Sequence, residues 1–268
     1  MIRQPAVAGL FYPAGAAALS RQVAGFLAGD TSPVDATAVI LPHAGYDYSG
    51  AVVGAVLGRI RVPRRVILLG PNHYGRGAAV AVTGATVWQT PAGAVPVAVD
   101  LLEHLRTEAP ELVVDERAHQ QEHSLEVLLP FLRHCQPQLQ IVPIALNHQL
   151  ECADCVNLGH AIARAVSSWD EPVLLVASSD MNHFLPAREN TRLDALALDA
   201  MTAFDPQRLY QVVEDHHISM CGVLPVVTVM TAARDLGAQA CDLVRYTHSG
   251  EQSGDNSRVV GYAGMMIN

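Results

Sequence analysis

The sequence contains no lysine, so its seventeen basic residues are all arginine. A Walker-type phosphate loop needs its lysine, and Schiff-base aldolases and pyridoxal-phosphate enzymes need a lysine amine. The absence of this one residue type therefore excludes three classes of enzyme.

Positive charge and long apolar runs are also scarce. The net charge is −9 and no basic cluster occurs, which argues against a nucleic-acid partner and against an anionic membrane. No apolar run reaches transmembrane length, and no signal-like segment stands at the amino terminus. The five cysteines are too few and odd in number for a disulfide framework. We expect a cytoplasmic protein with reduced thiols.

Hydrophobic residues make up 50% of the 268 positions, and no linker-like stretch divides them, so we expect one domain over residues 1–268. Residues 38–41 and 66–69 are short, apolar and rich in branched residues, as buried parallel strands are. Further strands are expected at 80–83, 140–146, 172–177, 242–247 and 259–267. Helices are expected at 16–27, 50–60, 97–108, 122–134, 153–167, 192–204, 206–214 and 220–236. The predicted class is α/β, with a mixed, mostly parallel central sheet flanked by helices.

Two histidines directly follow the first two predicted strands. His43 lies in the loop 42–46 and His73 in the loop 71–75, and each loop also contains Gly and Tyr. In open α/β sheets, ligands bind at the carboxyl ends of the strands. Glycine permits tight turns and lets a ligand approach the backbone closely. The pair therefore predicts a metal site.

The third ligand has two candidates. Asp180, in the loop after the strand at 172–177, would complete a two-histidine, one-carboxylate arrangement of the non-haem iron type. Cys221 stands at the start of an apolar helix, where the helix dipole favours a thiolate. The spacing does not choose between them.

Two further motifs have ordinary explanations. Residues 119–123 match the H-x-x-E-H pattern of a class of zinc proteases, but they start a helix inside an alternating α/β chain, so we do not expect a protease. We expect Glu122 and His123 to line the pocket as polar groups. Cys152 and Cys155 form a lone C-x-x-C and are interpreted as two thiols at the start of a surface helix.

Six segments, in the same order, together resemble the Memo family, which occurs as component B of the bacterial AmmeMemoRadiSam set. They are residues 3–13, 42–46, 70–73, 122–126, 178–183 and 221–222. This resemblance implies the fold of the class III extradiol dioxygenases (LigB-like), which hold non-haem iron(II) with two histidines and a glutamate. In the Memo family the glutamate position looks like a cysteine. The metal ligands implied for this chain are His43, His73 and Cys221.

The resemblance also suggests roles for the other polar residues. Asp180 and His183 become pocket residues with a part in catalysis, and His183 resembles the acid/base histidine of the dioxygenases. Glu122 and His123 become partners that orient a ligand, as metal-site partners do. Tyr46 is expected beside the same pocket.

The expected function is a cytoplasmic metal-binding redox protein, an iron- or copper-dependent oxidoreductase. A thiolate ligand favours iron(II), copper or zinc over magnesium or calcium, and iron(II) is the first choice. A thiolate facing dioxygen is itself oxidisable, so ring cleavage does not follow from the fold. The alternatives are a non-catalytic module that binds a small molecule or peptide and works with a radical-SAM partner, and a zinc-dependent hydrolase.

Overall fold

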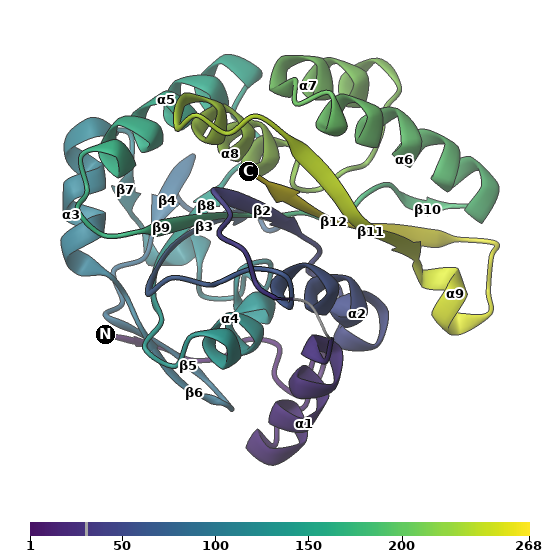
Figure 1. The fold of residues 1–268 in the computed structure, drawn as a ribbon, viewed down its shortest axis with the longest axis horizontal. Helices are drawn as coiled ribbons and strands as arrows, with labels where there is room; N and C mark the ends of the chain where they lie inside the picture. The colour runs from purple at the N-terminus through teal and green to yellow at the C-terminus, as the bar shows by residue number, and fades with distance from the viewer. Residues whose placement is uncertain (30–31) are drawn as a thin grey trace.

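The computed structural model describes residues 1–29 and 32–268, and in these residues nine strands form one mixed sheet. Four parallel strands make its centre (Figure 1). In spatial order they are β2 (Ala38–Leu41), β9 (Val173–Ser178), β3 (Arg65–Pro71) and β8 (Gln140–Leu146). Nearly every residue of these strands is buried, which explains why their sequences are continuously apolar.

Shorter or antiparallel strands complete the two edges of the sheet. Beyond β2 lie β12 (Val259–Ile267), β11 (Cys241–His248) and β10 (His183–Leu185), with β11 and β10 both paired to β12. Beyond β8 lie β4 (Val80–Val82) and β7 (Val113–Val114). The mixed, mostly parallel sheet of the sequence prediction is confirmed, including the antiparallel addition at its carboxyl-terminal end.

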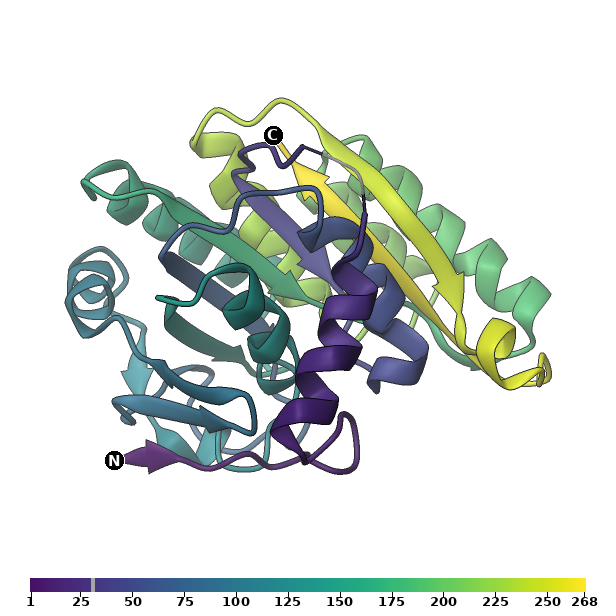
Figure 2. The same cartoon turned by 60° about the horizontal axis from the view of Figure 1, so that its bottom comes forward.

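A second, three-stranded sheet was not expected from the sequence. It consists of β1 (Ile2–Arg3), β5 (Val87–Thr90) and β6 (Gly93–Pro96). Figure 2 shows it beside the amino terminus, at the end of the molecule away from β11. The strands are too short for a periodic pattern to stand out in the sequence.

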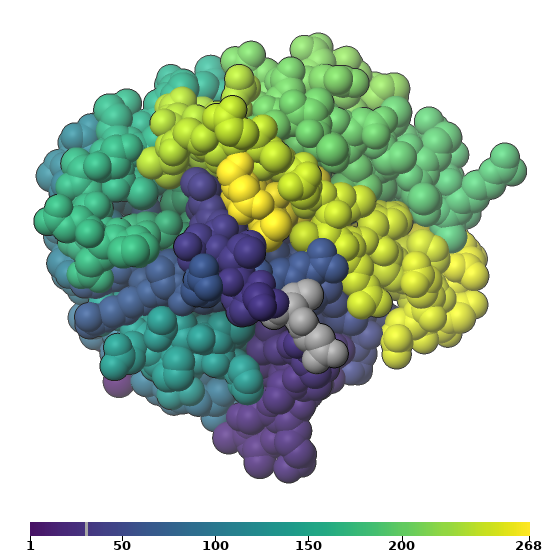
Figure 3. Space-filling model, viewed as in Figure 1, coloured from purple at the N-terminus to yellow at the C-terminus, as the bar shows by residue number. Residues whose placement is uncertain are grey.

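Helices cover both faces of the main sheet (Figure 1). One face carries α1 (Ala16–Leu27), α2 (Tyr46–Leu57) and α4 (Leu129–Cys135). The other carries α3 (Val99–Glu108), α5 (Cys152–Ser167), α6 (Ala187–Thr202), α7 (Pro206–Asp215) and α8 (Val223–Asp235). The short α9 (Ser249–Ser253) joins β11 to β12. In Figure 3, residues near the amino terminus and the carboxyl-terminal strands lie together on one face, as the pairing of β2 with β12 requires.

The helix predicted at 122–134 begins later than expected. Residues 122–125 are not helical, residues Glu126–Leu128 form a 3-10 turn, and α4 starts only at Leu129. The carboxylate of Glu122 accepts the N–H groups of His123 and Ser124, which holds this segment in a turn instead. The leucines at helical spacing belong partly to that turn.

The carboxyl ends of β2, β9 and β3 lie next to one another at one edge of the sheet. The segments that follow these strands carry His43, His183, which is the first residue of β10, and His73. None of the helices in the described residues is long and apolar enough to cross a membrane.

Candidate metal centre

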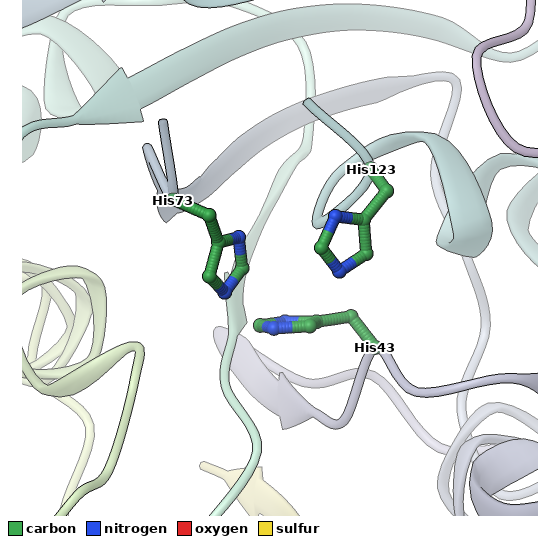
Figure 4. Close-up of side chains that lie close together, drawn as sticks. All are labelled: His43, His73 and His123. Atoms are coloured by element: carbon green, nitrogen blue, oxygen red, sulfur yellow. The ribbon is translucent and has the colours of Figure 1, made fainter. Parts of the chain in front are cut away.

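Three histidines converge where these loops meet. The nearest ligand atoms of His43, His73 and His123 all lie within 4.8 Å of one another. Figure 4 shows the three rings facing a common space, one from the loop after β2, one from the loop after β3 and one from the turn before α4. Three imidazoles at this separation form a donor set that suits a transition-metal ion.

His43 is held as a neutral ligand by its surroundings. Its backbone N–H donates to Asp180 (2.8 Å), and its ring Nδ1 lies 2.8 Å from the hydroxyl of Ser178. That hydroxyl donates its own proton to the carbonyl of Ser124, so it accepts from Nδ1–H. The lone pair of His43 is therefore on Nε2, which lies 3.2 Å from the Cys221 sulfur. Burial lowers the pKa of His43, and the ring stays uncharged.

His73 is oriented by a carboxylate. Glu122 accepts the backbone N–H of His73 at 2.7 Å through Oε2, and Oε1 lies 2.9 Å from Nδ1 of the ring. This leaves Nε2 of His73 for a metal, in the carboxylate–histidine pattern common at metal sites. Burial alone would raise the pKa of Glu122, but the hydrogen bond and charge of His73 and the backbone N–H groups lower it to about 2. The carboxylate is therefore ionised at neutral pH.

His123 lies closer to the centre than the sequence suggested. Its ring stacks on that of His73 with centroids 4.7 Å apart, and the ring of Phe11 packs beside it at 4.7 Å. Burial lowers the pKa of His123, which keeps it neutral. The sequence placed it among pocket residues, whereas the structure puts one of its nitrogens among the possible ligand atoms. In the sequence, the feature that could have indicated this position for His123 is the adjacent Glu122, whose carboxylate holds the turn.

Cys221 borders the histidine group through His43. Its sulfur also accepts the backbone N–H of Asp180 at 3.3 Å. Burial and then the charge of Asp180 raise the pKa of the thiol, so a metal ion would have to displace its proton. A Cβ on the next residue, Gly222, would collide with Ser178 and Ser179, so only glycine lets this loop pack so closely on the loop after β9.

Asp180, the other sequence candidate for third ligand, holds two loops together. Its Oδ1 accepts the backbone N–H of His43, and its own N–H donates to Cys221. Burial raises its pKa to about 7, against the backbone hydrogen bonds that lower it. The carboxylate is hydrogen-bonded to the backbone. Within the described residues it is not part of the group of converging ligand atoms.

His183 is fixed by the loop that leads to α8. Its ring Nδ1 lies 2.8 Å from the carbonyl oxygen of Ser219, and its backbone N–H donates to the hydroxyl of Ser219. Because a carbonyl only accepts, Nδ1 carries the proton and Nε2 is left as an acceptor. Burial lowers the pKa of His183, so Nε2 is available to take up a proton.

A buried polar network behind His183 was missed by the sequence analysis. Asp194 on α6 accepts from the backbone N–H of Asn182 (2.8 Å), from the side chain of Asn190 (3.0 Å) and from Tyr246 (2.7 Å). The side-chain oxygen of Asn182 in turn accepts the N–H and the hydroxyl of Ser219. Burial raises the pKa of Asp194 to about 6. The network ties the loop after β9 to the loop before α8.

The amino-terminal segment is anchored to the turn that carries His123. Buried Glu126 accepts from Arg3 (2.7 Å) and from the hydroxyl of Tyr12 (2.6 Å). Arg3 also donates to the carbonyls of His119 and Glu122. Residues 3–12 therefore stabilise the backbone on which two of the site's side chains stand.

Four other residues singled out in the sequence lie away from the group. Tyr46 is buried at the start of α2, where its hydroxyl donates to the carbonyl of Val127. His119 is fully buried against Trp88, so the two histidines of the protease-like pattern do not converge. Cys152 and Cys155 lie in the first turn of α5, as expected.

Comparison with known proteins shows similarity over nearly the whole chain. The family model described as Memo-like protein matches residues 3–266. A MEMO1 family protein of Aquifex aeolicus is 38% identical over 269 residues, which is 99% of each chain. One of Methanothermobacter thermautotrophicus is 36% identical over 98% of this chain and 99% of its own. A solved structure of an uncharacterized Escherichia coli K12 protein has a TM-score of 0.62 and 16% identity, covering 86% of this chain and 99% of that one, and shares the fold.

Proposed function

This chain belongs to the Memo family, and from that premise we propose that it is a metal-binding redox protein that works as a non-haem iron or copper oxidoreductase. One observation carries the proposal: three imidazoles, two of them held neutral by burial, converge within 4.8 Å beside a half-buried thiol. Neutral imidazole and sulfur are ligands that iron, copper and zinc prefer, whereas magnesium and calcium prefer oxygen.

The proposed ligands are His43, His73 and Cys221, with His123 as the alternative to the cysteine. His43 and His73 each present Nε2 for a metal because Ser178 and Glu122 engage the opposite ring nitrogen. Iron(II) is the first choice of metal, and copper or zinc the next. Bound iron or copper would supply electron transfer to a molecule held beside it.

His183 is proposed as the acid/base group. Its Nε2 faces no protein donor in the described residues, and burial keeps the ring neutral, so it can accept a proton from a bound molecule. Asp180 contributes by holding the backbone of His43 and Cys221 in place.

Metal content tests the proposal directly. We expect the protein from cells grown with iron and copper to contain about one redox metal ion per chain, and His43→Ala to lose it. Absence of bound metal in the wild-type protein, or unchanged content in the variant, would refute the proposal. Zinc alone would favour a zinc-dependent hydrolase, for which the same donor set is suitable.

The third ligand is tested with cobalt(II) as a spectroscopic substitute. A cysteine ligand gives a thiolate-to-cobalt charge-transfer absorption, which we expect in the wild-type protein and not in Cys221→Ser. If the band is absent from the wild type, and His123→Ala loses the metal whereas Cys221→Ser keeps it, the three-histidine set is correct instead.

A non-catalytic module that works with a radical-SAM partner is the alternative proposal, supported by the same group of side chains. Oxygen consumption separates the two. Metal-dependent consumption with an added organic substrate, lost in Cys221→Ser, favours the enzyme, and binding without any consumption favours the module.

A further inference from the structure

A cavity of about 330 Å³ opens beside the metal centre. His73 and Cys221 line it, whereas His43 and His123 do not. A molecule in this cavity would therefore approach the centre from the side of His73 and Cys221. Its volume suits a small organic molecule.

Most of the wall is apolar and comes from the end of β8 and the start of α8. The contributing side chains are Leu146, Leu150, Met220, Val223, Leu224 and Pro225. Contact with these side chains would stabilise the apolar part of a bound molecule, but they offer it no hydrogen bond.

Two polar side chains of the wall come from α7, in addition to Asn72, His73, His148 and Cys221 from other segments. Tyr210 and Glu214 are four residues apart, so they stand on the same side of this helix, and both line the cavity. Within the described residues Glu214 makes no ion pair, and the hydroxyl of Tyr210 makes no hydrogen bond. Burial, followed by the charge of Glu214, raises the pKa of Tyr210, which keeps its hydroxyl neutral. This wall therefore presents a carboxylate and a hydroxyl that are free for a ligand.

The charged side chains that line the cavity favour cationic ligands over anionic ones. No arginine lines the cavity, and its other ionisable side chains besides the tyrosine, glutamate and cysteine are His73 and His148. A carboxylate or phosphate on a ligand would meet no permanent positive charge there and would be repelled by Glu214. A protonated amine would be attracted to it.

We infer that this cavity binds a small amine with an apolar body, its ammonium group at Glu214 and Tyr210 and its body against the apolar wall. The inference rests on the proposed function in one respect, since such an amine would be the molecule presented to the metal centre. The chain's net charge of −9 acts in the same direction by attracting cations.

Three phenols of similar shape test the inference on the metal-free protein of residues 1–268. Tyramine carries an ammonium group, 4-propylphenol has no charge, and 3-(4-hydroxyphenyl)propanoate carries a carboxylate. We expect tyramine to bind about fivefold more tightly than 4-propylphenol, as one partly exposed ion pair allows, and the propanoate to bind most weakly. Calorimetry or ligand-observed NMR gives the three Kd values. Equal or tighter binding of the propanoate would overturn the inference.

Two matched substitutions identify the residue responsible. Glu214→Gln changes an exposed side chain and should make tyramine and 4-propylphenol bind alike. Glu251→Gln, an equally exposed position on α9 away from α7, should leave the preference for tyramine intact (Figure 1). If Glu214→Gln retains the preference, the amine is bound elsewhere and the inference is wrong.

The metal-free assay keeps this inference separate from the proposed function. If the metal-free protein prefers tyramine but the protein purified from cells grown with iron and copper contains no metal, only the metal-dependent function is refuted. Metal binding by a protein with no preference for the amine would refute the cavity inference alone. Leu224→Trp, which fills the cavity, should abolish binding of all three phenols in both the metal-free and the metal-loaded protein.

Discussion

At the scale of single residues, the centre depends on which ring nitrogen of each histidine is free. The hydroxyl of Ser178 fixes Nδ1 of His43, and the carboxylate of Glu122 fixes Nδ1 of His73. Both rings consequently present Nε2 toward the same space, before any metal is bound. This preorganisation reduces the conformational freedom that metal binding would otherwise remove.

Glu122→Gln tests the importance of that orientation. The amide keeps the size of the side chain but loses the charge that favours Nδ1–H of His73, so we expect metal affinity to fall about 10- to 100-fold. Competition titration with a chromophoric chelator measures the change. Glu116→Gln, which alters a carboxylate that caps Thr83 and Gly84, is the control and should keep wild-type affinity. Equal affinities in the two variants would show that orientation by Glu122 is unimportant.

At the scale of elements, α6 fixes both the loop after β9, which lies shortly before it in the sequence, and the more distant loop before α8. Asp194 bonds to the loop after β9 and, through Asn182, to the loop before α8. One helix therefore positions the segments that carry both His183 and Cys221.

The raised pKa of Asp194 predicts how stability depends on pH. The folded protein disfavours the ionised carboxylate, so its penalty is absent below the ordinary pKa near 3.8 and complete above the folded-state value of about 6. Stability from this group therefore falls as pH rises through that window, by about 3 kcal/mol. Asp194→Asn cannot ionise, so relative to wild type it should gain about this much in free energy of unfolding between pH 4 and pH 7.

Urea unfolding of both proteins across this pH range measures the difference. A constant offset between wild type and Asp194→Asn, with no change between pH 4 and pH 7, would contradict the assigned shift. The constant part of the difference reports the hydrogen bonds lost in Asp194→Asn. The new side-chain NH2 group of the variant faces Asn190 and Tyr246, which are both donors, and cannot accept from them.

The packing of α1 on α2 gives a second prediction at this scale. A Cβ at Gly54 of α2 would collide with the backbone and side chain of Phe26, whereas a Cβ at Gly25 of α1 would meet nothing within 4 Å. Gly54→Ala should therefore lower the free energy of unfolding by about 1–3 kcal/mol through overpacking. Gly25→Ala should raise it by about 0.5–1 kcal/mol, because alanine has the higher helix propensity. Thermal unfolding compares the two, and changes of the same sign would contradict this account.

At the scale of the whole molecule, the two ends of the chain close the structure around the parallel strands. The carboxyl-terminal β12 pairs with β2, and Arg3 reaches Glu126 across 123 positions of sequence. Both groups of this ion pair are almost fully buried. Removing one partner leaves the other charge buried with less compensation.

Arg3→Ala should therefore destabilise the entire fold by about 3–5 kcal/mol. The control is Arg61→Ala, which removes an exposed pair with Asp35 and should leave stability nearly unchanged. Chemical unfolding monitored at the tryptophans measures both. Equal small losses in the two variants would mean that the buried pair is not needed to hold the amino-terminal segment.

The sequence by itself determined the α/β class, the four parallel strands and the placement of His43, His73 and His183 at their carboxyl ends. These follow from local patterns, since an apolar run closed by Pro or Gly specifies a buried strand wherever it lies in the chain. The resemblance to known motifs favoured Cys221 over Asp180 as the expected third ligand. Only the tertiary structure decided that His123 joins the histidines, that Asp180 bonds to the backbone and that Asp194 holds two loops together. Those contacts join residues far apart in the chain, and the burial that sets their charge and geometry exists only once the elements have packed.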